Sequence, residues 1–154
     1  MNSASDKQAE VEGALTRAEQ LRQEKHYDEG IALLSDALRH GLEQAQIYYR
    51  LGNIYHDAKR YEHAEYAYRQ AIDHDSLHVN AHYNLGVVYR KQGRIDESLK
   101  MRRKANDVAR RHPERMKVKP EQVQSVRRFA RRMFISGLIL IGVIVLLVLL
   151  FRPT

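Results

Sequence analysis

The sequence predicts an all-α protein: helical hairpins stacked into a solenoid of about three repeats, followed by a single transmembrane helix. Three observations lead to this fold class. The 154-residue chain is rich in helix-forming residues and contains only three prolines. The sequence aligns with itself when it is shifted by a fixed number of residues, which indicates an internal repeat. An uncharged apolar run lies close to the C-terminus.

The self-similarity divides most of the chain into three units of equal length, 11–44, 45–78 and 79–112. Between the second and third units, Leu51-Gly52 matches Leu85-Gly86 and Tyr55 matches Tyr89. A period of this length is typical of solenoids built from paired helices, in which each pair buries its apolar face against the next. Residues that align across all three units are Tyr27, Tyr61 and Ile95, and also Ala37, Ala71 and Ala105.

The second unit resembles the tetratricopeptide-repeat (TPR) family over the residues Tyr48, Leu51-Gly52, Tyr55, Ala64, Tyr68 and Ala71. The resemblance covers 11–112 and is strongest in this unit. The third unit has Arg102 where the family has an aromatic residue, and the first unit has Ala18 in place of the glycine. The resemblance implies two antiparallel helices per unit, at about 45–58 and 61–74 in the second unit.

Residue types in the second unit suggest how its helices pack. We expect Gly52 and Ala64 to let the two helix backbones approach, and Tyr55 and Tyr68 to fill the space between neighbouring units. Since no hairpin can bury its apolar face alone, three are expected to stack into a short right-handed superhelix.

The TPR resemblance also implies a concave groove that binds a protein or peptide through the first helix of each unit. The first unit would contribute Leu15, Glu19 and Arg22, and the second Gln46. The main candidates for partner binding are Tyr49, Asn53, His56, Asn80, Tyr83, Val87 and Arg90. TPR co-chaperones bind a C-terminal carboxylate with a set of basic and amide residues, of which only Asn53 is present here. No such carboxylate clamp is expected.

The apolar run at 133–151, MFISGLILIGVIVLLVLLF, contains no charged residue. As a helix it would be about 28 Å long, close to the hydrocarbon thickness of a bilayer. Four arginines precede it, whereas only Arg152 follows in the short tail 152–154. The positive-inside rule then predicts a tail-anchored, single-pass protein with its repeat domain on the cytoplasmic side. The four arginines are Arg127, Arg128, Arg131 and Arg132.

The net charge of +7 is unevenly distributed. Residues 1–99 carry 12 Lys or Arg against 16 Asp or Glu, while 100–132 carry 13 against 3. This basic run favours contact with anionic membrane lipid and sets the topology. Nucleic-acid binding is not expected, because no RNA-binding motif or stacking aromatic accompanies the charge. Within it, 113–132 is expected to form a basic juxtamembrane linker or capping helix. Its part 121–132 either caps the solenoid or continues into the transmembrane helix, and 1–10 forms an N-terminal segment.

The sequence indicates neither a cofactor nor an enzyme activity. It has no cysteine, no phosphate-binding glycine loop and no paired His-Glu zinc motif. His74, His78 and His82 recur at every fourth position. A turn is expected between the first and last of them, so we do not predict a metal site.

These observations favour a membrane-anchored adaptor, or scaffold, that recruits a partner through the groove. An assembly or chaperone-like factor for a membrane or secreted protein complex is the alternative. The sequence does not indicate an oligomeric state.

Overall fold

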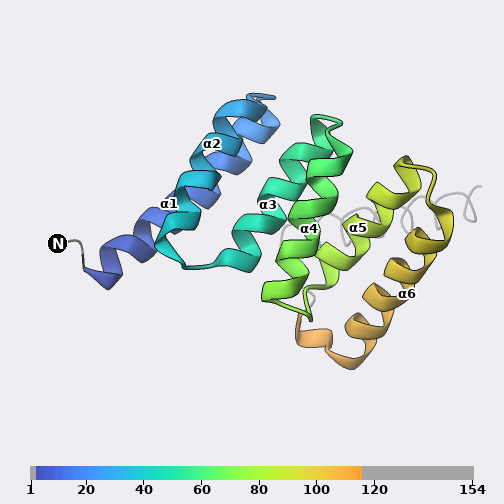
Figure 1. The fold of residues 1–154 in the computed structure, drawn as a ribbon. Coiled ribbons are helices and arrows are strands. Elements are labelled where there is room, and N and C mark those ends of the chain that lie inside the picture. The colour runs from blue at the N-terminus through green and yellow to red at the C-terminus, as the bar shows by residue number, and fades with distance from the viewer. Residues whose placement is uncertain (1–2, 116–154) are drawn as a thin grey trace, which may run out of the picture. The chain divides into compact units, whose positions relative to one another are not determined.

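The computed structural model describes residues 3–115, whose regular elements are all helical, as predicted (Figure 1). The α-helices are α1 (Ala4–Gln23), α2 (Tyr27–Ala37), α3 (Gln44–Asp57), α4 (Tyr61–His74), α5 (Val79–Lys91) and α6 (Ile95–Arg111). Two 3-10 helices are η1 (Leu38–His40) and η2 (Pro113–Arg115).

Several expectations concern residues outside the described range. These are the transmembrane helix at 133–151, the arginines that precede it, most of the segment 113–132, and the tail 152–154. Within 3–115, no helix combines the length and apolar character needed to cross a bilayer.

The helices pair as the three hairpins α1–α2, α3–α4 and α5–α6, which stand side by side in a row (Figure 1). The second helix of each hairpin begins at one of the aligned residues, Tyr27, Tyr61 and Ile95. In the second unit the helices at 44–57 and 61–74 agree closely with the predicted ranges.

The turn inside each hairpin repeats the same backbone geometry. Lys25, Lys59 and Gly93, which occupy equivalent positions in the three units, adopt left-handed φ angles of 65°, 59° and 79°. The next backbone N–H donates to a carbonyl five positions earlier, closing the helix end as Schellman motifs do. The three bonds run from His26 to Leu21, from Arg60 to Tyr55 and from Arg94 to Tyr89, each at 2.8 Å. The repeat is therefore present in the first hairpin too, where the sequence pattern is weakest.

The first helix begins earlier than the repeat. We expected residues 1–10 to form a separate N-terminal segment, but α1 starts at Ala4. Ser3 caps it: its hydroxyl accepts from the backbone N–H of Asp6 at 3.2 Å, and its own N–H donates to the Asp6 carboxylate at 2.8 Å. This reciprocal capping box is a local signal that a search for the repeat period does not detect.

Two apolar clusters hold the hairpins together. One joins α1, α2, α3 and α4, and the other joins α4 to α5. The aligned residues Ala37, Ala71 and Ala105 are all buried. The first cluster includes Val11, Ala18, Leu34, Ile47, Leu51 and Ile54, and the second consists of Ala64, Tyr68, Leu85, Val88 and Tyr89.

Tyr68 fills the space between the second and third units, as predicted, and is only 1% exposed. The expected role of Gly52 needs correction. A Cβ built on Gly52 would lie 2.5–2.9 Å from atoms of the Tyr68 ring, so this glycine makes room for a side chain rather than for the α4 backbone. At the equivalent Gly86, a Cβ would lie 3.0 Å from the Ser98 carbonyl oxygen of α6. There the close approach does involve helix backbone.

Candidate binding groove

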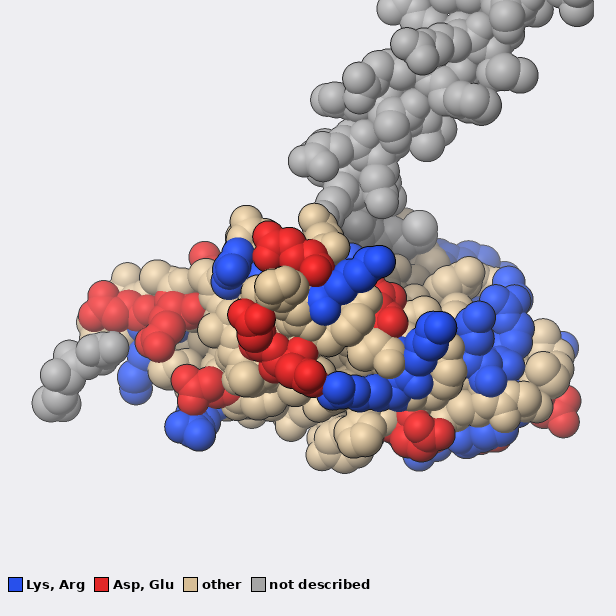
Figure 2. Space-filling model, turned by 90° about the horizontal axis from the view of Figure 1, so that it is seen from above, with Lys and Arg blue, Asp and Glu red and all other residues tan. Residues whose placement is uncertain are grey.

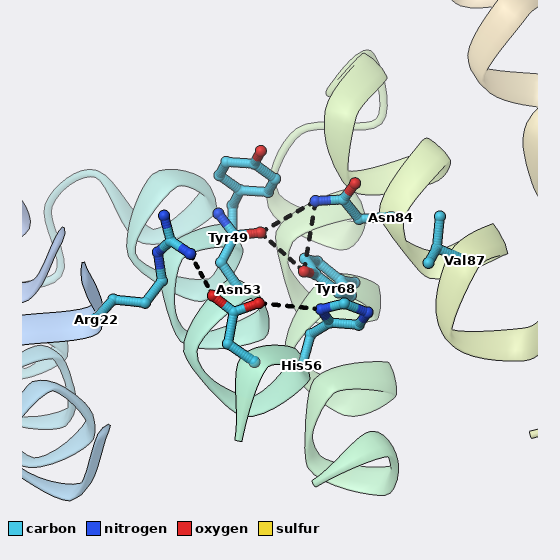
Figure 3. Close-up of a pocket in the computed structure, with 8 residues that line it drawn as sticks. Arg22, Tyr49, Asn53, His56, Tyr68, Asn84 and Val87 are labelled. Atoms are coloured by element: carbon cyan, nitrogen blue, oxygen red, sulfur yellow. Dashed lines mark hydrogen bonds and ion pairs between the residues drawn. The ribbon is translucent and has the colours of Figure 1, made fainter. Parts of the chain in front are cut away.

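A hollow with a volume of about 280 Å³ opens among the first helices of the three hairpins. We call it the central hollow. Helix α3 supplies half of its wall, and α1, α4 and α5 supply the rest (Figure 3). Its lining residues are Arg22, Tyr49, Asn53, His56, Asp57, Tyr68, Asn84 and Val87.

Equivalent positions in the repeat explain why these side chains meet. Glu19, Asn53 and Val87 are each one repeat length apart, so the stacking of hairpins places them in corresponding positions on α1, α3 and α5. The same position is therefore ionic in the first unit, an amide in the second and apolar in the third. The chemistry of the groove changes from hairpin to hairpin.

An amide and phenol network forms the middle of the hollow (Figure 3). The Tyr68 hydroxyl donates to Asn53 Oδ1 at 2.8 Å, and Asn84 Nδ2 donates to the same oxygen at 3.0 Å. Burial raises the pKa of Tyr68, so its hydroxyl keeps the proton that it donates. The network holds both amide groups in place, and one polar atom of each is used in these hydrogen bonds.

The remaining polar atoms of these amides have no partner within residues 3–115. They are Asn53 Nδ2, a donor, and Asn84 Oδ1, an acceptor, and neither is among the buried unsatisfied atoms of this range. A peptide bond offers one acceptor and one donor, and it can be bound by such a pair. The middle of the hollow is thus suited to main-chain recognition.

An ionic network lies beside the amides. Glu19 accepts from Arg22 Nη2 at 2.7 Å and from Arg50 Nη1 at 2.9 Å. Arg22 also pairs with Asp57, which lies 3.3 Å from His56 Nδ1. The hydrogen bond from Arg22 lowers the pKa of Glu19 to about 2, with Arg50 adding to this effect, so Glu19 is a carboxylate at neutral pH. Two arginines face two carboxylates, which leaves no surplus positive charge for an anionic ligand.

Four of the seven main candidates line the central hollow: Tyr49, Asn53, His56 and Val87. The other three, on α5, are not among its lining residues. One of them, Tyr83, is 46% exposed and lies under the Arg102 guanidinium, whose carbon is 5.8 Å from the ring centroid. The remaining two are Asn80 and Arg90.

Sequence reasoning missed three lining residues, Asn84, Asp57 and Tyr68, of which Tyr68 was expected only to fill the space between units. The first two could have been found from helical spacing. Asn84 follows Asn80 by four positions and precedes Val87 by three, while Asp57 follows Asn53 by four. Residues three and four apart share a helix face.

The three regularly spaced histidines have separate structural roles. His74 ends α4 and stacks on Tyr48, with ring centroids 5.6 Å apart. His78 accepts from the backbone N–H of Ala81 at 3.2 Å and packs against Tyr49. His82 is buried inside α5, where its Nε2 bonds the Ser76 carbonyl at 2.9 Å. In the part of the chain that the structure describes, no group of three or more ligating side chains could hold a metal ion.

Comparison with known proteins identifies the repeat. Family models described as "TPR repeat" and "Tetratricopeptide repeat" match residues 52–93 and 79–112. A solved structure, MamA MSR-1 C2, is similar in fold with a TM-score of 0.59 and 21% sequence identity. The similarity covers 66% of this chain and 58% of that chain, and at this identity it shows the fold alone. No curated protein sequence matches. Residues 52–112 thus match tetratricopeptide repeats, and such repeats indicate a scaffold for protein–protein interaction.

Proposed function

We propose that this protein is a membrane-anchored adaptor whose central hollow binds an extended peptide segment of a partner protein. The observation that carries the proposal is the pair of amides, Asn53 and Asn84, held by Tyr68 with a donor and an acceptor left for a ligand. Such a pair can bind any main chain, so affinity would come from the backbone and selectivity from the residues on either side.

The residues on either side suggest the partner's chemistry. Towards α1 the hollow ends at the compensated ionic network of Arg22 and Asp57, which favours a polar, uncharged side chain. Towards α5 it ends at Val87, which favours an apolar one. Tyr49 offers an aromatic surface between them. A partner segment with a small polar residue followed by an apolar residue fits this order.

Attachment to a membrane is the second part of the proposal. It rests on the apolar run at 133–151 and on the arginines before it, which by the positive-inside rule favour a repeat domain on the cytoplasmic side. A tether raises the local concentration of the groove near membrane-bound partners, so a weak peptide contact becomes effective.

Peptide selection tests the groove. The full chain in lipid nanodiscs would be used to select from a displayed library of short random peptides. We expect Asn84→Ala and Val87→Glu to lose the enriched sequences. Asn80→Ala is the matched control, because it removes an amide from the same helix at a position that does not line the hollow. If Asn80→Ala and Asn84→Ala select the same peptides as the unmodified chain, the hollow is not the binding site.

Membrane fractionation tests the anchor. The full chain should resist extraction by alkaline carbonate, whereas a chain lacking 133–151 should become extractable. If the deletion leaves carbonate resistance unchanged, the membrane determinant lies elsewhere.

The alternative, an assembly factor, makes a different prediction once a partner is known. An adaptor should co-purify with its partner in a stable complex, whereas an assembly factor should bind immature partner only and be absent from the finished complex.

A further inference from the structure

One face of α6 carries an unusual concentration of positive charge. The face is defined by the helical spacing three, four, seven, ten and eleven, and it spans about 16 Å along the helix axis. Five of its six residues are basic and exposed, and the sixth is acidic and half-buried. We call this face the α6 stripe: Lys100, Arg103, Lys104, Asp107, Arg110 and Arg111.

The stripe is not a requirement of the repeat. In α4 the equivalent positions, one repeat length earlier, begin with Tyr66, Arg69, Gln70 and Asp73, which balance in charge. In the first hairpin the equivalent positions, two repeat lengths earlier, begin with Ala32, Ser35 and Asp36 of α2 and Arg39 of η1, which balance too. The surrounding surface agrees, because Lys and Arg dominate the end of the described domain that α5 and α6 form (Figure 2). The third hairpin therefore carries a charge that its fold does not explain.

Most of this charge is uncompensated. Asp107 pairs with both Arg110, at 3.2 Å, and Arg111, at 3.0 Å, so one carboxylate serves two guanidinium groups. Within residues 3–115, Lys100, Arg103 and Lys104 form no ion pair. Four net positive charges remain on a straight helix face, which suits an extended anionic surface better than a single anion.

We infer that the α6 stripe binds the anionic lipid headgroups of the membrane and orients the repeat domain on it. The inference rests on the anchor proposed above. The stretch between Arg111 and Met133, 112–132, can span at most about 75 Å when fully extended. An inserted segment would thus hold the stripe within reach of headgroups, whose negative potential attracts each nearby Lys or Arg.

The side chains of the stripe favour lipid over nucleic acid. Proteins that bind single strands stack the bases on aromatic side chains. The stripe has no aromatic residue, and its cations match an extended surface of negative charge. Because the attraction is electrostatic, it should weaken strongly as salt rises.

The experiment uses the full chain, which lacks cysteine and can be labelled at one introduced site. Asn106→Cys places an environment-sensitive dye beside the stripe, and Ser35→Cys places it on the exposed face of α2. Each labelled protein is placed in nanodiscs of phosphatidylcholine alone or mixed with phosphatidylserine. The fraction of dye protected from an aqueous quencher gives the ratio of docked to undocked protein.

We expect protection at residue 106 in the phosphatidylserine discs only, with loss of protection in high salt and no protection at residue 35. The triple change Lys100→Gln, Arg103→Gln and Lys104→Gln should lower the docked-to-undocked ratio by about 100-fold, since each cation contributes about fivefold. The matched control changes Lys7, Arg17 and Arg39 to Gln, which alters net charge equally but away from α6. It should leave the ratio within about threefold.

Three results would overturn the inference. The dye at residue 106 could stay accessible on phosphatidylserine discs, the two triple variants could lose protection equally, or an RNA duplex could protect the dye where phosphatidylserine does not. Failure of the anchor is separate, because it appears as loss of the chain from neutral discs during gel filtration. In that case the labelled full chain is added to phosphatidylserine vesicles, and protection of the dye at residue 106 from the quencher shows whether the α6 stripe binds the lipid.

Discussion

The second and third hairpins use the same positions of the repeat for opposite purposes. In the second, Tyr68 packs on Gly52 and is buried by Leu85, Val88 and Tyr89 of the following hairpin. In the third, Arg102 stands at the position of Tyr68 and its Cγ packs on Gly86, but its guanidinium reaches the exposed ring of Tyr83. In both hairpins the glycine of the first helix contacts the side chain at this position of the second helix.

The difference shows that the neighbours of a repeat position decide its chemistry. Tyr68 is apolar on the side that α5 covers, and its hydroxyl reaches the groove. Arg102 keeps the aliphatic contact with the glycine and presents a charge to solvent, as amphipathic side chains do at a surface. Within residues 3–115 no further hairpin follows α6, and Arg102 is a side chain that suits an exposed position there.

Removal of these two side chains should give the largest contrast. Tyr68→Ala deletes a buried ring from the second cluster and should destabilise the fold by about 3–5 kcal/mol. Arg102→Ala removes an exposed side chain and should cost less than about 1 kcal/mol. Urea unfolding of the full chain in mild detergent, followed by the helical circular-dichroism signal, measures both. Equal losses would show that Arg102 is as deeply involved in packing as Tyr68.

The paired glycines should differ by a smaller amount. In Gly52→Ala the new methyl group would overlap the buried Tyr68 ring, which should destabilise the protein by about 1–3 kcal/mol. In Gly86→Ala the nearest atoms lie at 3.0 Å, so a shift of a few tenths of an ångström suffices. There a gain of up to about 1 kcal/mol in helix propensity offsets the contact.

The same unfolding measurement distinguishes these two glycines. The double variant Gly52→Ala with Tyr68→Ala is the control, because without the ring the methyl group has space. Its stability should equal or exceed that of Tyr68→Ala alone, and a further loss would contradict the proposed overlap.

The turn residues offer a third contrast, in which Lys59 and Gly93 occupy the same left-handed conformation. That conformation disfavours a side chain with a Cβ, by about 1 kcal/mol. Lys59→Gly should therefore stabilise the fold slightly, and Gly93→Lys should destabilise it by about 1 kcal/mol in the same urea unfolding measurement. If both changes destabilise, side-chain contacts of Lys59 outweigh its backbone conformation.

Acid should weaken the junction between the first and second hairpins, with the smallest effect of the series. That junction includes Glu19, bonded to Arg22 and Arg50, while the junction with the third hairpin has its own ion pair of Glu65 and Arg94 at 2.6 Å. The pKa of Glu19 is about 2 in the fold against 4.5 ordinarily, so its contribution is complete above pH 4.5 and is lost as pH falls towards 2.

Glu19→Gln measures this contribution. The stability difference between the variant and the unmodified chain should be about 1 kcal/mol or less near neutral pH, and it should shrink as the pH falls below the ordinary pKa of a glutamate. Other carboxylates titrate equally in both proteins, so they cancel in the difference. A difference that is constant with pH would mean that the substitution acts through packing instead.

The sequence was sufficient to predict the hairpins because residues within each unit mark where its helices begin and end. Tyr61 and Ile95 mark helix starts, and the glycine two positions before Ile95 adopts the left-handed turn. The helical extension at Ala4 was missed because it lies outside the period. The contact of the Tyr68 ring with Gly52 was also missed, because spacing shows that a small residue is needed there but not which group packs against it.

The site was predicted less completely, for a similar reason. The TPR resemblance placed Tyr49, Asn53 and Val87 on the groove-facing sides of their helices, but it could not show that Tyr68 of α4 reaches through to bond Asn53. It also could not show that Arg22 is neutralised by carboxylates from two hairpins. The first fact depends on how the two helices of one hairpin pack, and the second on how neighbouring hairpins stack, and spacing along the sequence shows neither.

The recurring turn also bears on the order in which the chain folds during synthesis. Each hairpin closes through a bond between residues five apart, and its two helices are adjacent in sequence. Contacts of such short sequence separation form early and quickly. We therefore expect the first hairpin to be helical on the ribosome before the third has emerged. Amide exchange on nascent chains stalled after residue 78 would show protection at Leu21 and His26 if this is so.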